Sequence, residues 1–142
     1  MRIVVIGQSA FGESVFNALI EQGGNVVGVF APPDRRGRSV DPLKLAASGR
    51  GIPVMQFSRM RDQEAISTMQ RLNADLCVMA YVTDIVPQAI LEDPTHGTIQ
   101  YHPSLLPKHR GPSSINWPII LGKSRTGLTI FWPDKGLDAG PI

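Results

Sequence analysis

The segment RIVVIGQSAFGESVFNALIEQGG (Arg2–Gly24) contains two different apolar patterns in succession. Its first part, Arg2–Ile6, is a continuous apolar run, which is typical of a strand buried on both faces of a sheet. After a loop, apolar residues recur at helical spacing over positions 15–20, and Gly23 with Gly24 ends that helix. The segment therefore predicts a strand, a loop and a helix in direct succession.

The same alternation continues along the chain. Further strands are predicted at Asn25–Phe30, Ile52–Phe57, Asp75–Ala80, Gly97–His102 and Gly127–Trp132. One helix is predicted to begin with a cap at Asp41 and Pro42 in its first turn. A second helix has Ile66, Met69 and Leu72 on one face. A third is predicted to follow a cap at Ser113 or Ser114. Strands alternating with helices predict an α/β fold, with an open, mostly parallel sheet and helices on both faces.

The composition is that of one globular domain, and we expect residues 1–142 to form a single domain. Hydrophobic residues make up 42% and charged residues 18% of the 142, and a formal charge of +2 does not indicate a polyanion-binding surface. Cys77 lies in an apolar run and is predicted to be a buried thiol. Without a long apolar run or a basic leader, the expected location is cytoplasmic. The ending LDAGPI reads as interrupted, so we expect the amino-terminal part of a longer protein, truncated at its carboxyl end.

The loop after the first strand, Gly7–Ser14, lies where ligands bind in such folds. The dinucleotide fingerprint needs three glycines, and only Gly7 and Gly12 fit because Ser9 takes the place of the second. Asp34, after the second strand, has the residue type of a ribose-binding acid. A non-catalytic nucleotide-binding module is thus one alternative, although a tight turn and a solvated loop explain the same residues.

A second candidate site is the stretch QYHPSLLPKHRGPSSINW (Gln100–Trp117). His102 ends a predicted strand, and Pro103 and Pro107 forbid regular structure in the loop that follows. Rigid presentation of a histidine at the end of a strand suits general acid–base chemistry. The structural alternative is a histidine whose ring nitrogens are hydrogen-bonded within a turn.

A carboxylate partner for His102 is predicted from the last strand. Asp138 lies in a glycine-flanked loop just after it, and Asp134 is the competing carboxylate. Because parallel strands end at the same edge of a sheet, we expect the carboxylate and the imidazole to converge. Such a pair orients the imidazole and stabilises its charged form.

These residues are similar to the signature of a known family. HPSLLPKHRG (His102–Gly111), INW (Ile115–Trp117) and GLTIFWPDKGLDAG (Gly127–Gly140) resemble the folate-dependent formyltransferases, and the resemblance runs along the whole chain. It implies a Rossmann-like sheet of the formyltransferase amino-terminal type. Within the family, the chain looks most similar to the amino-terminal hydrolase domain of the 10-formyltetrahydrofolate dehydrogenases.

The resemblance also implies the roles of individual residues. The catalytic residues would be His102, Asp138 and Gln100, where Gln100 stands at the position of the family's asparagine. Folate binding falls on backbone groups of the loop YVTDIV, chiefly at Asp84, Ile85 and Val86. The residues Ser104, Leu105, Leu106 and Pro107 would border the same cleft.

The implied function is an enzyme of one-carbon metabolism that binds 10-formyltetrahydrofolate, without a metal, and cleaves or transfers its formyl group. The acceptor stays open among water, a carrier-bound thiol and an amine, and the departure at Gln100 favours cleavage. The alternative is methionyl-tRNA formyltransferase or another amine formyltransferase, and only the former would need a nucleic-acid partner. The arginines in Arg35–Arg38 suit an anionic group, either the folate glutamate tail or an acceptor phosphate.

Overall fold

The computed structural model describes all residues 1–142 and shows two compact units, Met1–Thr98 and Ile99–Ile142. Six strands form one sheet in the order β3-β2-β1-β4-β5-β6. Three of the pairings are parallel, β1 with β2, β1 with β4 and β2 with β3, whereas β5 and β6 are antiparallel. The predicted α/β class with an open, mostly parallel sheet is therefore confirmed.

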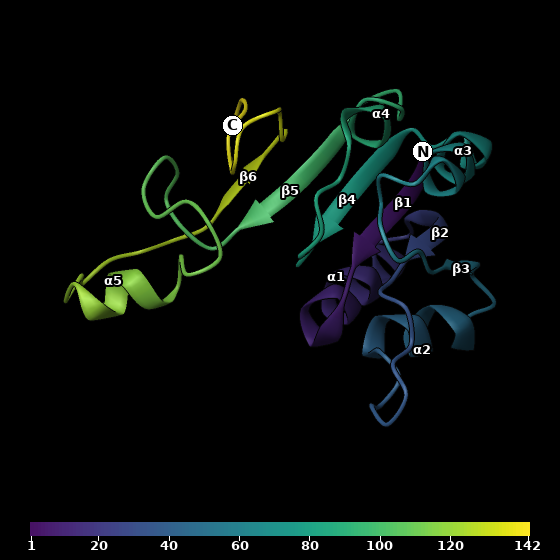
Figure 1. Ribbon diagram of the computed structural model, residues 1–142, viewed down its shortest axis with the longest axis horizontal. Coiled ribbons are helices and arrows are strands. Elements are labelled where there is room, and N and C mark those ends of the chain that lie inside the picture. The colour runs from purple at the N-terminus through teal and green to yellow at the C-terminus, as the bar shows by residue number, and fades with distance from the viewer. The chain divides into compact units, whose positions relative to one another are not determined.

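The elements follow the predicted alternation, with differences at their ends (Figure 1). The strands are β1 (Arg2–Gly7), β2 (Asn25–Phe30), β3 (Val54–Met55), β4 (Leu76–Ala80), β5 (Thr98–His102) and β6 (Thr129–Phe131). The helices are α1 (Ser9–Glu21), α2 (Pro42–Gly49), α3 (Gln63–Leu72), α4 (Gln88–Leu91) and α5 (Asn116–Ile120). The sequence did not predict α4, and β3 is shorter than the predicted strand.

Two separate apolar clusters cover the two faces of the sheet in the first unit. On one face, residues of β1 and β4 pack with α3 and α4, and Met69 of α3 is fully buried. On the other face, residues of β1 and β2 pack with α1 and α2, where Phe16 and Leu43 are fully buried. Alternate residues of β1 point to the two clusters, as the pleat of a strand requires. Burial on both faces explains the continuous apolar run at Arg2–Ile6.

The glycines of the first loop are required by close packing. A Cβ atom on Gly7 would lie 2.5 Å from the carbonyl oxygen of Ala80, and one on Gly12 would lie 3.2 Å from Leu43. Only glycine allows the end of β1 to lie this close to β4. These two glycines therefore have a structural reason to be present that is independent of any nucleotide.

Asp41 connects the starts of two helices. One of its carboxylate oxygens accepts a hydrogen bond from the Leu43 amide (2.9 Å), and the other accepts one from the Ser9 amide (2.8 Å). The first bond caps α2, with Pro42 in its first turn, so the predicted cap is confirmed. The second bond holds the loop after β1 against the start of α2.

The second unit departs from two predictions. The register pairs His102 with Thr129 and Gln100 with Phe131 in antiparallel fashion, so the expectation that the last strand is parallel is wrong. A serine cap on α5 is also wrong, because Ile115 occupies the cap position in a helical conformation and no side chain caps the helix. The preceding turns already supply carbonyl acceptors, as the bond from the Trp117 amide to the Ser113 oxygen shows.

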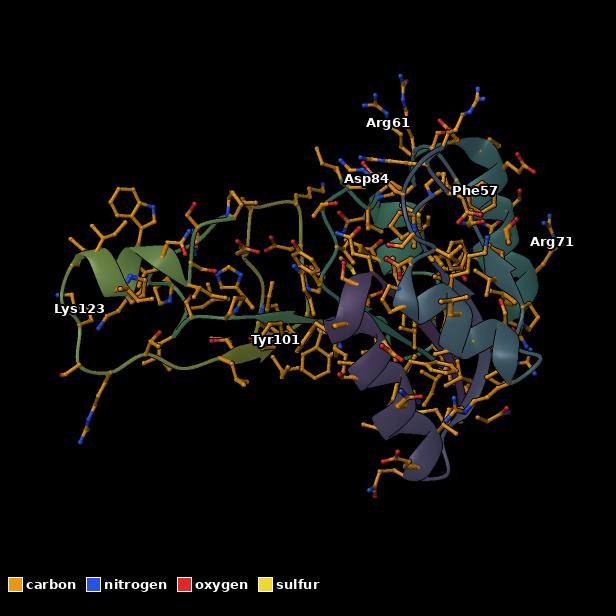
Figure 2. All side chains as sticks on the ribbon, turned by 90° about the horizontal axis from the view of Figure 1, so that it is seen from below. Phe57, Arg61, Arg71, Asp84, Tyr101 and Lys123 are labelled. Carbon is orange, nitrogen blue, oxygen red and sulfur yellow. The ribbon has the colours of Figure 1, made fainter.

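Many apolar side chains of the second unit are exposed. We call the following residues the apolar surface: Leu105, Ile115, Trp117, Ile119, Ile120, Leu121, Leu128, Ile130, Trp132 and Leu137. Figure 2 shows side chains of α5 projecting into open space. Ile119 is 73% exposed, and in α5 only Pro118 is buried. No helix of the chain is both long and apolar enough to cross a membrane.

Candidate active site

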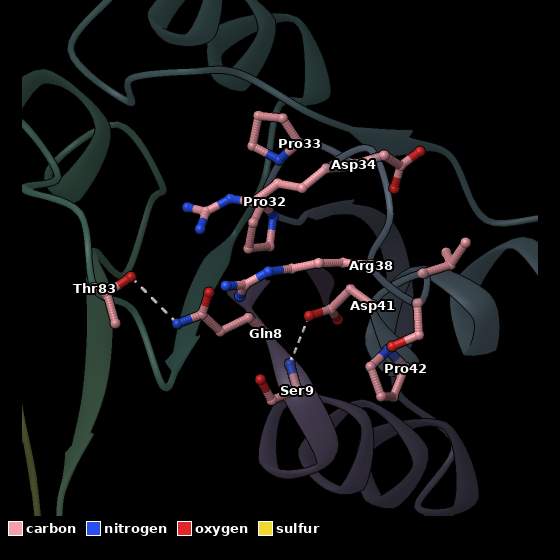
Figure 3. A pocket seen from close by; sticks show the side chains of 12 residues that line it. Gln8, Ser9, Pro32, Pro33, Asp34, Arg38, Asp41, Pro42 and Thr83 are labelled. Atoms are coloured by element: carbon pink, nitrogen blue, oxygen red, sulfur yellow. Dashed lines mark hydrogen bonds between the residues drawn. The ribbon is translucent and has the colours of Figure 1, made fainter.

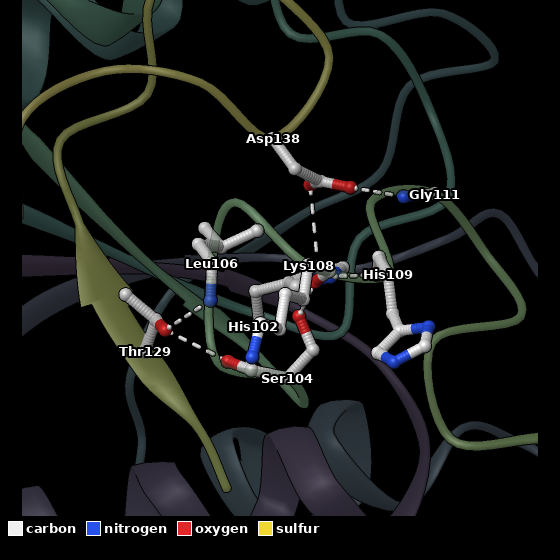
Figure 4. Close-up of polar contacts among 8 residues, drawn as sticks. All are labelled: His102, Ser104, Leu106, Lys108, His109, Gly111, Thr129 and Asp138. Carbon is white, nitrogen blue, oxygen red and sulfur yellow. Dashed lines mark hydrogen bonds and ion pairs between the residues drawn. The ribbon is translucent and has the colours of Figure 1, made fainter. Parts of the chain in front are cut away.

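His102 is the last residue of β5 and is 5% exposed. Its Nδ1 atom lies 3.5 Å from Oδ1 of Asp138, and its Nε2 atom lies 2.9 Å from the carbonyl oxygen of His109 (Figure 4). The ring is therefore held between a carboxylate and a carbonyl within the second unit. The predicted convergence of His102 with Asp138 is present in the structure.

The second oxygen of Asp138 fixes the loop that follows His102. It accepts a hydrogen bond from the Gly111 amide at 2.6 Å, as Figure 4 shows. Asp134, the competing carboxylate, instead accepts a bond from the Gly136 amide at 2.7 Å. Of the two carboxylates considered, Asp138 is thus the one paired with the imidazole.

The geometry around the His102 ring suits its doubly protonated form. A carboxylate and a carbonyl are both acceptors, so each ring nitrogen needs a proton in order to donate. At 3.5 Å, the contact with Asp138 is longer than a usual hydrogen bond, and it is an ion pair only when the ring is protonated. An imidazolium in this position has one N–H group directed at a backbone carbonyl, and that group is available to a stronger acceptor.

The loop after His102 is held by a buried network around Thr129. The Thr129 hydroxyl donates to the Ser104 carbonyl (2.7 Å) and accepts from the Leu106 amide (3.1 Å). Ser104 is fully buried, and its own hydroxyl donates to the Lys108 carbonyl (2.6 Å). The sequence analysis missed Thr129, because its role depends on its position opposite His102 in the antiparallel register.

A tight return of the chain brings Asp138 back to His102. Because β6 runs antiparallel to β5, it leads away from the end of β5 where His102 lies. The segment 132–141 then folds back, with bonds from the Trp132 amide to the Pro141 oxygen (2.9 Å) and from the Asp134 amide to the Ala139 oxygen (3.1 Å). The two residues thus converge through this turn and not through a shared parallel edge.

Gln100 lies two residues before His102 on the same strand. Successive side chains of a strand alternate between its faces, so these two side chains share a face of β5. Gln100 is half-buried and opposite Phe131 in the register. Its side-chain amide makes no hydrogen bond with another group of the protein, so it can donate to or accept from a substrate. Its catalytic role stays a prediction.

The predicted folate loop lies in the first unit and is held at two points. The Asp84 carboxylate accepts bonds from the amides of Met60 and Ile85, both at 2.8 Å. The Gln8 amide donates to the Thr83 hydroxyl at 3.2 Å, which connects this loop to the loop after β1. Asp84 thus holds the loop in shape, in agreement with a binding role that uses backbone groups.

The remaining predicted binding residues differ in accessibility. Ile85 is 81% exposed, and Val86 packs against the core of the first unit. In the second unit, Leu105 and Pro107 are exposed and Leu106 is half-buried, whereas the hydroxyl of buried Ser104 is already used in the loop. Contacts of these residues with folate stay a prediction.

Asp34, the candidate ribose-binding acid, has a partner within the protein. Its carboxylate forms an ion pair with Lys44 and accepts a bond from the Gln56 amide at 3.2 Å. The hydrogen bond from Lys44, supported by that from Gln56, lowers the pKa of Asp34. Asp34 and the two glycines thus each have a structural role that does not depend on a dinucleotide.

Comparison with known proteins identifies relatives over the whole chain. The formyl transferase family matches residues 1–142. The chain is 45% identical over its full length to the mitochondrial 10-formyltetrahydrofolate dehydrogenase of Mus musculus and 46% identical to the cytosolic enzyme of Homo sapiens. It is 41% identical to the methionyl-tRNA formyltransferase of Alkaliphilus oremlandii. The chain spans 16% of the length of each dehydrogenase and 47% of the tRNA enzyme.

Solved structures of related proteins share the fold. The phosphoribosylglycinamide formyltransferase of Anaplasma phagocytophilum superposes with a TM-score of 0.81 at 28% identity, and the chain covers 69% of it. The enzyme of Bacillus halodurans gives a TM-score of 0.82 at 22% identity, and the chain covers 76% of it. A formyltetrahydrofolate deformylase of Pseudomonas syringae gives 0.77 at 22% identity, with 48% of it covered.

Proposed function

Since this chain belongs to the formyl transferase family, we propose that it is a folate-dependent enzyme of one-carbon metabolism that acts on 10-formyltetrahydrofolate and removes its formyl group. The observation that carries the proposal is the His102–Asp138 pair, enclosed in the second unit and fixed by Gly111 and His109. The names of the full-length relatives, which are dehydrogenases of this same folate, support the substrate.

His102 would stabilise the negative charge that develops on the formyl oxygen during attack. Its Nε2–H group would exchange the His109 carbonyl for that oxygen, which is the stronger acceptor once it becomes anionic. Asp138 keeps the ring oriented and its positive charge compensated throughout. The same carboxylate would accept the proton that the attacking water loses as its oxygen bonds to the formyl carbon.

The leaving nitrogen of the folate must receive a proton. The His102 imidazolium is the candidate donor, because it carries a proton on the nitrogen that faces away from Asp138. The Gln100 amide, on the same face of β5, would orient the formyl group or the water through a hydrogen bond. Each of these roles uses a group of the second unit.

Water is the acceptor that we favour. Gln100 stands where the family's asparagine is expected, and the first relatives described above are dehydrogenases rather than amine formyltransferases. Transfer to a carrier-bound thiol or to an amine is the second candidate, and similarity to a methionyl-tRNA formyltransferase supports the amine. A cytoplasmic location stays a prediction, since the relatives include a cytosolic and a mitochondrial dehydrogenase.

A folate-release assay tests this proposal. The purified chain is mixed with 10-formyltetrahydrofolate, and tetrahydrofolate is followed with water alone, with added thiol and with added amine. Replacing His102 with alanine should lower the rate by about 10²–10³-fold, which is typical for loss of one donor to an oxyanion. Folate binding, measured by fluorescence titration, should be retained.

The control replaces a histidine outside the pair. His96→Gln should leave the rate within about twofold of the unchanged protein, as surface substitutions away from a site usually do. Normal turnover in His102→Ala, or an equal loss in both variants, would contradict the assignment. If tetrahydrofolate is released only when an amine is added, the proposed activity becomes that of an amine formyltransferase.

A further inference from the structure

Tyr81 directly follows β4 and has a backbone conformation that is unusual for its residue type. Its φ angle is +62°, in the left-handed region, where a residue with a large side chain is rare because its Cβ atom crowds the next carbonyl group. Glycine takes the same conformation without this cost. A tyrosine at this position therefore lowers the stability of the fold relative to a glycine.

The turn at Tyr81 follows a backbone contact between β4 and β1. The Ala80 carbonyl oxygen accepts a hydrogen bond from the Gln8 backbone amide (3.4 Å) and would lie 2.5 Å from a Cβ atom on Gly7. The chain leaves the sheet directly after this contact, and Tyr81 is the residue at which it turns. Because the contact involves backbone groups of β4 only, it does not require a tyrosine ring at position 81.

The side chain of Tyr81 gains no stabilisation from its own surroundings. Tyr81 is 53% exposed and packs against neither apolar cluster, whereas Val82 and Val86 of the same loop pack against the cluster of α3 and α4. Its hydroxyl group makes no hydrogen bond within the protein, and its ring contacts no other aromatic ring and no cation. A residue that costs stability and makes no such contacts is best explained by an interaction with a ligand.

The loop that carries Tyr81 is fixed by hydrogen bonds on both sides. The Asp84 carboxylate accepts a bond from the Met60 amide at 2.8 Å. The Thr83 hydroxyl accepts a bond from the Gln8 side chain at 3.2 Å, at the wall of a pocket of about 400 Å³ (Figure 3). The tyrosine thus lies on a fixed loop at the carboxyl end of a central strand, where open α/β sheets bind ligands.

We infer that the Tyr81 ring stacks on the aminobenzoyl ring of the folate. Offset stacking of two aromatic rings stabilises a complex beyond the burial of their surfaces, and it requires a flat partner. The aminobenzoyl ring is flat and fully conjugated, whereas tetrahydropterin contains a saturated, puckered ring. The identity of the ligand rests on the proposed function, but the unpaired side chain of Tyr81 does not.

Steady-state folate release by Tyr81→Gly tests the inference. This change removes the ring, so the KM for 10-formyltetrahydrofolate should rise by at least about tenfold, with kcat within about twofold of the unchanged protein. The midpoint of urea unfolding should stay the same or rise, because glycine relieves the crowded backbone. Weaker binding without loss of stability distinguishes a ligand contact from a structural role.

Three further variants serve as controls. Tyr81→Phe keeps the ring and should leave the KM within about threefold, whereas Tyr81→Leu keeps the apolar bulk and should raise it about three- to tenfold. Asn73→Gly is the matched backbone control, because Asn73 also has a positive φ (+45°) but lies at the end of α3. It should leave the KM unchanged.

An unchanged KM in Tyr81→Gly, an equal KM in the phenylalanine and leucine variants, or an equal rise in Asn73→Gly would overturn the inference. A protein that releases no tetrahydrofolate would contradict the proposed function instead. Calorimetric titration with p-aminobenzoylglutamate then tests the stacking, since it needs no catalysis. Binding that is weakened in Tyr81→Gly but kept in Tyr81→Phe would support the contact, and absent or equal binding would overturn it.

Discussion

Thr129 shows how one hydroxyl group holds the loop beside the proposed catalytic histidine. It bonds the Ser104 carbonyl and the Leu106 amide while 7% exposed. Thr129→Val keeps the shape of the side chain but leaves both backbone groups unsatisfied. We expect the free energy of unfolding to fall by about 1–3 kcal/mol, the cost of such buried groups. Urea denaturation measures it, and exposed Thr126→Val, the control, should change it by less than about 0.5 kcal/mol.

Cys77 gives a prediction about pH at the same scale. Burial raises the pKa of its thiol from 9.0 to about 12, although an interaction with the Thr98 side chain opposes this. Between these values the unfolded chain loses the proton and the folded chain keeps it, so stability should fall as the pH rises. Iodoacetamide at about pH 9 should modify the thiol only after denaturation, because the thiolate is the reactive form. Rapid labelling of the folded protein would show that the thiol is accessible.

The turn that carries Asp138 depends on glycine at one position. A Cβ atom on Gly140, which has a φ of +119°, would lie 1.9 Å from the Trp132 carbonyl oxygen. Gly140→Ala must therefore displace the turn. Folate release should then fall by at least about tenfold, because Asp138 no longer orients the His102 ring. Gly122 also has a positive φ (+61°) but has open space around it, so Gly122→Ala tests the backbone conformation alone. Equal activity in the two variants would contradict the prediction.

The elements that the sequence predicted well are those with local signals. The apolar run of β1, the helical spacing of α1 and the Asp41 cap of α2 each depend on neighbouring residues only. Helix α4 was missed because four residues are too few to show a period. The sequence pattern also could not predict the direction of β6, since a strand has the same alternation of side chains in either direction.

The candidate site was predicted in part. Residue types and loop position identified His102 and Asp138, but the stated reason, a shared parallel edge, was wrong because β6 is antiparallel. Gly111 and the His109 carbonyl were not predicted, since backbone groups carry no residue-type signal. The sequence pointed to the arginines in Arg35–Arg38 by their charge alone. In the structure, Arg35 and Arg38 line a pocket and Arg36 does not.

At the scale of the whole molecule, we expect the apolar surface of the second unit to promote association in solution. Exposed apolar patches bind hydrophobic dyes and promote association. We expect the double change Ile119→Ser and Ile120→Ser to lower anilinonaphthalene sulfonate fluorescence and the apparent mass in size-exclusion chromatography. Leu45→Ser removes an exposed apolar side chain of α2 in the first unit and is the control. An equal effect of this control would contradict a surface confined to the second unit.

The two oxygens of Asp138 make loop closure and histidine pairing a single event. One oxygen holds the Gly111 amide and the other faces His102, so a loop that opens by shifting this carboxylate also leaves the imidazole without its counter-ion. We therefore expect two forms, a closed one in which the ring is paired with Asp138 and an open one in which it is not. If the pair is required for catalysis, as proposed, a ligand that stabilises the closed loop should raise the activity.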